Sequence, residues 1–353
     1  MTNRLDRCRK LMAQREIKAF LVTEIDNVRY LSGFTGSSGA CLLTETGGYF
    51  VTDGRYRLQA PREVQTLEIR IEPQGTTREL TDLLKSVGLP IGFESEHISV
   101  ARLKRWQDET GAEYHPIENL VEDLRRVKDP EEIGLIQEAV EIVDTTFDRI
   151  LDFLKPGRTE REIAVELDIQ MLRLGAEAFG FESIVASGPN SAFPHARPSN
   201  RPLERGDFLT MDFGAVLRGY NSDITRTVVI GEAGSKEREI YGAVLEAQLK
   251  ALAAVRAGIK GQDVDAVARE SITAAGYGEQ FSHNLGHSLG RHVHDGPALG
   301  RTVERELEVG MVVTVEPGIY VEGLGGVRIE DDVVVRADGC DILTKSSKEL
   351  RVI

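Results

Sequence analysis

The chain has 353 residues and a formal net charge of −14, with 41% hydrophobic and 28% charged residues. This composition is typical of globular proteins and excludes a largely disordered chain, and the length is sufficient for two domains with separate cores. The acidic excess argues against nonspecific binding to nucleic acid or anionic membranes, and it suits cation binding.

The amino terminus and the cysteines give no sign of export. The first ten residues, MTNRLDRCRK, are polar, and no stretch approaches the roughly 18 apolar residues that a membrane span needs. We therefore expect a soluble, cytoplasmic protein. Cys8, Cys41 and Cys340 are widely spaced and odd in number, which predicts buried thiols, and neither a disulfide framework nor a zinc knuckle.

Helix and strand patterns alternate in the first third of the chain. Apolar spacing predicts, in order, a helix at 5–12, a strand at 19–22, a hairpin at 41–51, a strand at 67–71, a helix at 77–87 and a strand at 90–93. Residues 1–126 are therefore predicted to form an α/β domain.

A new domain is predicted to begin just before Asp129. This residue can cap a helix, Pro130 suits the first turn, and two glutamates follow at the positive end of the helix dipole. The helical spacing continues to Phe147, and we expect the helix to end near 155–157. The second domain is thus predicted to cover residues 127–353.

This second domain contains an internal similarity. A shift of 101 residues aligns Leu154 with Val255, Gly157 with Gly258, Glu162 with Asp263, and Gly175 with Gly276. Both copies read as helix, glycine turn, helix and glycine stop, and Thr159 with Glu162 forms a capping box. The pattern predicts two related halves, each a helix pair followed by β-hairpins, folded face to face.

Two aspartates lie on a predicted hairpin in the first half. Apolar and β-branched residues flank a turn at Arg218-Gly219, and Asp212 and Asp223 occupy its two strands. Opposite residues of a hairpin lie about 5 Å apart, so both carboxylates are expected to face one point. Because they would repel each other, either a shared proton or a cation is expected there.

The second half supplies an imidazole and two more carboxylates. Four of the seven histidines fall within residues 283–294, and a strand at 312–315 ends in Glu316. Glu330 lies in another strand, at 326–335. Two aspartates, a histidine and two glutamates suit a pair of divalent cations such as Mn²⁺, Fe²⁺, Co²⁺ or Zn²⁺, whereas Ca²⁺ rarely recruits histidine.

These residues lie in the contexts MDFG, SDITR, GHSLG, EPGIY and RIEDD. In these contexts they resemble the five ligands of the pita-bread metallopeptidases, which include methionine aminopeptidase, aminopeptidase P and prolidase. The resemblance covers essentially the whole chain. It implies an α/β (α+β) protein with a creatinase-like amino-terminal domain and a pita-bread catalytic domain of two pseudo-symmetric halves. Methionine aminopeptidase ordinarily lacks such an amino-terminal domain, which favours the proline-directed branch.

The resemblance also implies roles for individual residues. Two divalent ions, preferably Mn²⁺ with Co²⁺ or Zn²⁺ as alternatives, would be held by Asp212, Asp223, His287, Glu316 and Glu330. Glu316 would take the proton of a water between the ions. His195 and His294 would hydrogen-bond the substrate carbonyl, and Arg328 would meet a substrate carboxylate or link the ligands.

Simpler roles stay open for several residues. His195 could be an ordinary loop histidine, and Arg328 could serve only in ion pairs. His283 and His292 have no assigned role and are expected to pack or to support the ligands. Ser288 replaces a common glycine and Asp295 a more frequent glutamate, which leaves the shape of the pocket in question.

The resulting functional prediction is a cytoplasmic, dinuclear-metal Xaa-Pro aminopeptidase, a homodimer that acts on peptides with proline at the second position. An Xaa-Pro dipeptidase is the alternative. A metal-free creatinase-like amidinohydrolase would lack several of the ligands. A non-catalytic binding module on the same fold would carry degraded ligands and long charged tails, whereas this chain ends soon after Lys348.

Overall fold

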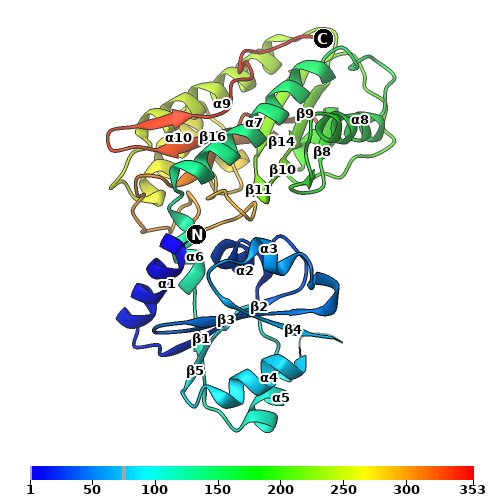
Figure 1. Cartoon of the computed structure of the whole chain (residues 1–353). Coiled ribbons are helices and arrows are strands. Elements are labelled where there is room, and N and C mark those ends of the chain that lie inside the picture. Colours follow the sequence, from blue (N-terminus) through cyan, green and yellow to red (C-terminus); the bar gives the residue numbers. More distant parts are fainter. Residues whose placement is uncertain (1, 74–76) are drawn as a thin grey trace. The chain divides into compact units, whose positions relative to one another are not determined.

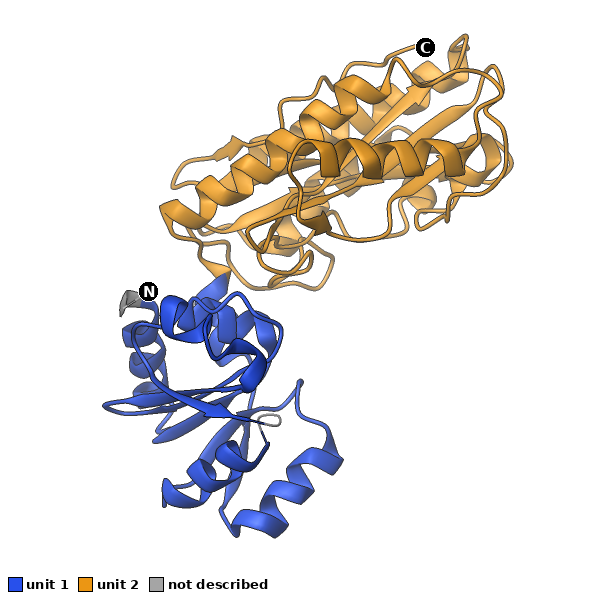
Figure 2. Cartoon of the chain, turned by 45° about the vertical axis from the view of Figure 1, so that its right-hand side comes forward, with its two compact units in different colours: residues 1–125 blue, residues 126–353 orange. Residues whose placement is uncertain are grey.

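The computed structural model describes residues 2–73 and 77–353 of the chain. The chain divides into two compact units, residues 1–125 and 126–353 (Figure 2). Each unit contains hydrophobic cores of its own. Within the described residues, no helix is both long and apolar enough to cross a membrane.

Unit 1 is a mixed six-stranded sheet with helices on both faces (Figure 1). The strand order is β4-β3-β2-β1-β5-β6, with β1/β2 and β2/β3 antiparallel and the other pairs parallel. Its elements are α1 (Thr2–Gln14), β1 (Ala19–Val22), α2 (Ile25–Ser32), β2 (Ala40–Thr44), β3 (Gly48–Asp53), η1 (Gly54–Tyr56), α3 (Ala60–Glu63), β4 (Glu68–Glu72), α4 (Thr77–Ser86), β5 (Ile91–Glu94), α5 (Val100–Thr110), β6 (Tyr114–Ile117) and α6 (Leu120–Arg126).

The central strands of this sheet are buried on both sides. Phe20 and Val22 of β1 pack in one core with α1, α2 and α6, whereas Ala19 and Leu21 pack in a second core with α4 and α5. Successive side chains of a strand point to opposite faces, so a strand covered on both faces reads as a continuous apolar run. The predicted α/β arrangement, with its hairpin of β2 and β3, is confirmed.

Unit 2 combines two helix pairs with short, mostly antiparallel strands (Figure 1). Its elements are α7 (Pro130–Ile150), α8 (Glu160–Arg173), β7 (Ala178–Phe179), β8 (Ile184–Ser187), η2 (Gly188–Ala192), β9 (Phe208–Phe213), β10 (Ala215–Leu217), β11 (Tyr220–Asn221), β12 (Ile224–Val229), α9 (Ser235–Ala254), α10 (Gly261–Ala274), η3 (Gly278–Gln280), β13 (Val312–Val315), β14 (Gly318–Val321), β15 (Gly325–Arg328), β16 (Asp331–Val335) and β17 (Cys340–Ile342).

The two predicted halves are present in unit 2. Helices α7 and α8 share a core with the sheet β12-β9-β8, and α9 and α10 share a core with β13-β16-β17. The aligned glycines adopt the same left-handed conformation, with φ of 90° and 79° at Gly157 and Gly258, and 106° and 89° at Gly175 and Gly276. Glycine adopts this conformation without steric cost, which explains why both copies have it after a helix.

The helix starts agree with their predicted caps. Asp129 forms a capping box with Glu132 at α7, and Thr159 forms one with Glu162 at α8. Helix α7 ends earlier than predicted, at Ile150, and a turn follows in which the amide of Phe153 donates to the carbonyl of Ile150, three residues before it.

The predicted hairpin of the two aspartates is wrong in one respect. Strands β10 and β11 form the tip around Arg218-Gly219, but β9 and β12 pair in a different sheet, in which Asp212 lies opposite Thr225 and not opposite Asp223. The break falls at Gly214, where a Cβ atom would lie 2.3 Å from the Ser222 carbonyl oxygen. This close approach of two backbones separates the tip from the base of the hairpin.

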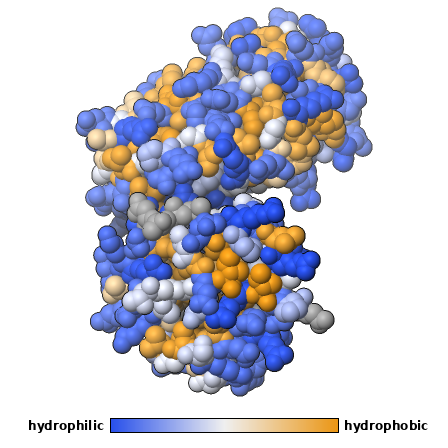
Figure 3. All heavy atoms as spheres, in the orientation of Figure 1, coloured by the Kyte–Doolittle hydropathy of each residue, from blue (hydrophilic) through white to orange (hydrophobic). Residues whose placement is uncertain are grey.

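All three cysteines are free thiols. Cys8 and Cys41 are buried as predicted, and burial raises the pKa of Cys8 to about 12, whereas Cys340 is partly exposed. The outer surface is dominated by hydrophilic side chains on the face shown in Figure 3, with smaller hydrophobic groups between them. This surface is expected from the charged fraction of the sequence.

Candidate metal centre

The four predicted carboxylate ligands lie at equivalent places in the two halves. Asp212 is next to last in β9 and Asp223 immediately precedes β12, its antiparallel partner. In the second half, Glu316 follows β13 and Glu330 precedes β16, which are also paired. Each half therefore presents two carboxylates from one end of a strand pair.

The fifth predicted ligand, His287, joins the two halves of the site. Its Nε2 lies 3.6 Å from Asp223 Oδ2 and 3.6 Å from Glu316 Oε1. Possible ligand atoms of Asp223, His287 and Glu330 all lie within 4.8 Å of one another. Arg328 connects Asp212 with Glu316. Its Nη2 lies 2.5 Å from Asp212 Oδ2, and its Nε lies 3.9 Å from Glu316 Oε2. The structure thus brings all five residues together.

Two oxygens in this cluster have no hydrogen-bond partner in the part of the chain that the structure describes. Within the described residues, Oδ1 of Asp212 and Oδ1 of Asp223 are buried and accept no hydrogen bond. Asp223 is 4% exposed and Glu330 is 1% exposed. A buried polar atom without a hydrogen bond costs about 1 to 3 kcal/mol, and more when the group is charged, unless the group is protonated or bound to a cation.

The ionisation of the cluster points to a cation. Burial, together with Glu330 and Asp212, raises the pKa of Asp223 well above its usual range, and burial raises the pKa of Glu316 to about 8. Burial also lowers the pKa of His287 to about 4, which keeps the imidazole neutral and able to bind a metal. Four carboxylates and one neutral imidazole fit divalent ions of the Mn²⁺ to Zn²⁺ series.

Three side chains that the sequence did not single out support these ligands. Thr225 Oγ1 donates to Glu330 Oε2 at 2.7 Å, and Thr314 Oγ1 donates to Glu316 Oε1 at 3.3 Å. Asp332 accepts the amide of Asp223 at 2.9 Å. Such contacts orient metal ligands. Each lies two residues from a predicted ligand, which is the signal that could have revealed them.

Arg226 is another functional residue that sequence analysis missed. It is 1% exposed and donates hydrogen bonds to the Glu330 carbonyl, to Asp331 and to the Ser346 carbonyl. These bonds fix the backbone that carries Glu330. An arginine within the apolar and β-branched strand ITRTVV was the available signal, because a buried guanidinium requires partners.

A cavity of about 370 Å³ opens beside the cluster. Its walls include the predicted substrate residues His195, His294 and Arg328, as well as His283. The ring of His294 stacks edge-to-face on His287, with centroids 4.2 Å apart, and burial and the nearby His195 lower the pKa of His294. The predicted ligands and the predicted substrate residues therefore share one cavity.

His283 has a more specific environment than sequence analysis expected. Its Nε2 lies 2.9 Å from the Tyr320 hydroxyl, which also accepts a hydrogen bond from Arg328. Burial, and secondarily Arg328, lower the pKa of His283 to about 3. His283 and Tyr320 thus extend the network of Arg328 along the cavity wall.

Arg328 is 3% exposed and most of its donors are engaged. Besides Asp212 and Tyr320, it donates to Thr225 Oγ1 and to the carbonyl of Pro194. This arrangement favours the predicted linking role. Contact with a substrate carboxylate stays a prediction.

The two departures from the common family pattern lie behind the cavity wall. Ser288 is fully buried and donates to the Pro297 carbonyl. Asp295 accepts the Arg291 amide and forms an ion pair with Lys128. Both therefore hold the segment after His287 in place.

Comparisons with known proteins agree with this architecture. Residues 134–337 match metallopeptidase family M24, and residues 4–127 match the creatinase/prolidase N-terminal domain. An Xaa-Pro dipeptidase of Pyrococcus furiosus is 37% identical over 99% of this chain and 100% of its own length.

Two solved structures are also similar along the chain. An Xaa-Pro dipeptidase from Bacillus anthracis has a TM-score of 0.97 and 41% identity, covering 100% of this chain and 99% of the other. An X-Pro aminopeptidase from Thermotoga maritima has a TM-score of 0.89 and 40% identity, covering 95% and 97%.

Proposed function

The chain belongs to metallopeptidase family M24 and is therefore a peptidase, and we propose that it is an Xaa-Pro dipeptidase. Such an enzyme hydrolyses dipeptides with a carboxy-terminal proline. The relatives support this alternative better than the aminopeptidase that sequence analysis favoured. Full-length relatives from Pyrococcus furiosus, Pyrococcus horikoshii and Bacillus anthracis all carry the dipeptidase name. Proline lacks an amide hydrogen, so its peptide bond requires a dedicated site.

The observation that carries the proposal is the buried cluster of four carboxylates and an imidazole, in which two carboxylate oxygens have no partner among the described residues. Two divalent ions would be held there by Asp212, Asp223, His287, Glu316 and Glu330. We propose Mn²⁺ as the native ion, with Co²⁺ or Zn²⁺ as alternatives. When bound, such ions neutralise the carboxylates and lower the pKa of water toward neutrality.

The other roles belong to side chains of the chain itself. Glu316 accepts the proton that the attacking water loses, which suits a carboxylate at the cavity wall. His195 and His294, which line the cavity from two different segments, donate hydrogen bonds to the substrate carbonyl and stabilise the negative charge that develops on its oxygen. Arg328 fixes Asp212 and Tyr320 so that this arrangement does not move during the reaction.

The test compares Ala-Pro, Ala-Pro-Ala and Ala-Ala-Ala as substrates of the full chain. Protein stripped of metal and reloaded separately with Mn²⁺, Co²⁺ or Zn²⁺ is assayed with each peptide, and the amino acids released are measured. We expect the highest kcat/KM for Ala-Pro. Faster cleavage of Ala-Ala-Ala than of either proline peptide would reject proline specificity.

An Xaa-Pro aminopeptidase is the second candidate, because the similar Thermotoga maritima protein carries that name. It predicts that Ala-Pro-Ala is cleaved faster than Ala-Pro in the same assay. The homodimer and the cytoplasmic location also stay predictions, and light scattering of the purified protein tests the first of them.

A further inference from the structure

His195 lies between β8 and β9 in a connecting segment, residues 188–199, which begins with η2 and continues without regular structure. Its side chain is exposed, and its ring makes no hydrogen bond within the described residues. The neighbouring Pro194 accepts a hydrogen bond from Arg328, and the amide of Gly326 donates to Ser191. The position of the imidazole therefore depends on how the backbone of this segment is held, since loops are mobile unless tied down.

Both ends of the segment converge on one buried carboxylate, Glu160, the first residue of α8. Glu160 is 0% exposed. Its Oε1 accepts the amide of Ser187 at 2.7 Å and the Ser187 hydroxyl at 2.8 Å. Its Oε2 accepts the amide of Ser199 at 3.0 Å and the Ser199 hydroxyl at 2.5 Å. Asn190 donates to both oxygens.

The partners of Glu160 lie immediately before the segment, inside it and at its end. These hydrogen bonds to the carboxylate come from backbone amides, the Asn190 side-chain amide and hydroxyl groups. A single rigid group thus closes the segment into a loop whose two ends are fixed relative to each other.

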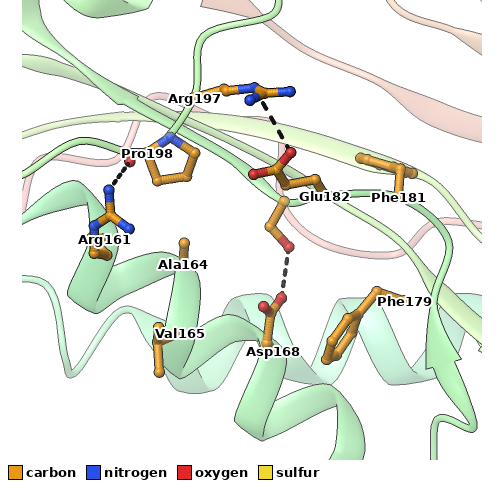
Figure 4. Close-up of a pocket in the computed structure, with 10 residues that line it drawn as sticks. Arg161, Ala164, Val165, Asp168, Phe179, Phe181, Glu182, Arg197 and Pro198 are labelled. Atoms are coloured by element: carbon orange, nitrogen blue, oxygen red, sulfur yellow. Dashed lines mark hydrogen bonds and ion pairs between the residues drawn. The ribbon is translucent and has the colours of Figure 1, made fainter.

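Helix α8 reinforces this closure with its first turn. The amides of Glu160 and Arg161 donate to the carbonyls of Arg201 and Ser199, which satisfies backbone donors that a helix start leaves free. Figure 4 shows the Arg161 side chain reaching from α8 to the carbonyl of Pro198, three residues after His195. The start of α8 therefore holds the whole return path of the loop.

We propose that Glu160 is a positioning residue for His195. It fixes the backbone of the loop 188–199 so that the imidazole points into the cavity, within hydrogen-bond distance of the substrate carbonyl. The proposal rests on the proposed function, in which His195 hydrogen-bonds that carbonyl. Glu160 itself does not line the cavity, so it acts through the loop and has no contact with substrate.

The test is a double-mutant cycle in the full, Mn²⁺-loaded chain with Glu160→Gln and His195→Ala. Glutamine keeps the shape of the side chain but turns an NH₂ group toward donors. A small displacement of a catalytic group can cost on the order of 100-fold, so we expect Glu160→Gln to lower kcat by about 10-fold to 100-fold with little change in KM. In the His195→Ala background it should change kcat by less than about threefold.

Asp168→Asn is the matched control. Asp168 lies two turns further along α8, and its carboxylate accepts a hydrogen bond from Ser183, outside the loop (Figure 4). We expect this variant to behave alike in both backgrounds. A full loss from Glu160→Gln in the His195→Ala background would overturn the proposal, because Glu160 would then act independently of His195.

Hydrogen exchange supplies a readout that does not depend on activity. In Glu160→Gln the amides of residues 188–199 should exchange about tenfold faster or more, with the rest of unit 2 unchanged. Unchanged exchange in the loop would also overturn the proposal. If Glu160→Gln does not fold, Ser199→Ala, which removes one hydroxyl contact, replaces it in both measurements.

The peptide assay of the wild-type protein distinguishes a failure of the proposed function from a failure of the role proposed for Glu160. If the wild type prefers another peptide over Ala-Pro, the cycle is measured with that peptide. If it cleaves none of the peptides, loop exchange alone decides the role of Glu160.

Discussion

Asp223 lies where the chain enters β12, with one carboxylate oxygen 3.6 Å from His287 and the other without a hydrogen-bond partner in the described chain. We expect Asp223→Asn to bind less metal and to lose on the order of 100-fold or more in kcat/KM, because even residues behind the ligands are worth about 10-fold to 100-fold. Metal content by mass spectrometry and peptide hydrolysis measure the two effects.

The control for this variant is Asp341→Asn. Asp341 is exposed and pairs with Arg336, which follows β16 at the end opposite to Glu330. Its loss should leave both metal content and turnover unchanged. Wild-type turnover in Asp223→Asn would contradict the proposed centre.

Residue chemistry explains which parts of the site could be predicted from the sequence. The five proposed ligands stand out because carboxylates and histidine are unusual beside apolar strands. Thr225 and Glu160 do not stand out, since threonine is common in strands and glutamate is common at helix starts. Their importance depends on partners more than 20 residues away, Glu330 for Thr225 and Ser187 and Ser199 for Glu160.

At the scale of elements, the segment that carries His287 is bound closely to β13. The amide of Thr314 donates to the His287 carbonyl, and a Cβ atom at Gly286 would lie 2.1 Å from the Thr314 carbonyl oxygen. Neither backbone can move without breaking this contact. Gly286→Ala should therefore destabilise the protein by about 1 to 3 kcal/mol and weaken metal binding.

Gly242→Ala is the opposite case and the control. Gly242 is an exposed residue in the middle of α9, and among the described residues no neighbouring atom lies within 4 Å of a Cβ placed there. Alanine should stabilise the protein by up to about 1 kcal/mol, because it restricts the unfolded chain and favours the helix. Urea unfolding measures both variants, and equal midpoints for the two would contradict the argument.

Local rules predicted most elements, but they failed where two backbones approach each other closely. The caps of α7 and α8 and the continuous apolar run of β1 depend on neighbours in the sequence, so their patterns are readable. The division of the hairpin at Gly214 depends on its close approach to the Ser222 carbonyl, and nothing in the apolar pattern indicates it.

At the scale of the molecule, the two units have separate cores and all five proposed ligands belong to unit 2. A fragment of residues 126–353 should therefore fold and bind Mn²⁺ without unit 1. Cooperative thermal unfolding, with a midpoint that rises when Mn²⁺ is added, would bear this out. A fragment with a broad transition that does not respond to the ion would show that unit 1 is required for folding.

The buried carboxylates of the proposed metal centre make the free energy of unfolding of the chain depend on pH and on bound metal. Burial raises the pKa of Glu316 from 4.5 to about 8, so between these values the metal-free native protein binds more protons than the unfolded chain. The free energy of unfolding of the metal-free protein should therefore fall as pH rises through this window. The lowered pKa values of His283 and His287 act in the opposite direction below their ordinary value of 6.5.

Between about pH 6.5 and about pH 8 the histidines no longer oppose this effect, and the free energy of unfolding of the metal-free protein should fall. Bound Mn²⁺ keeps the carboxylates ionised and removes the penalty, and its uptake releases protons. Stabilisation by Mn²⁺ should thus increase across this range, and unfolding midpoints measured in EDTA and in Mn²⁺ test it. Glu316→Gln, which cannot titrate, should flatten the decline of the metal-free protein. A metal-free midpoint that rises with pH would mean that the carboxylates are already neutralised within the chain, and the argument for a cation at this cluster would fail.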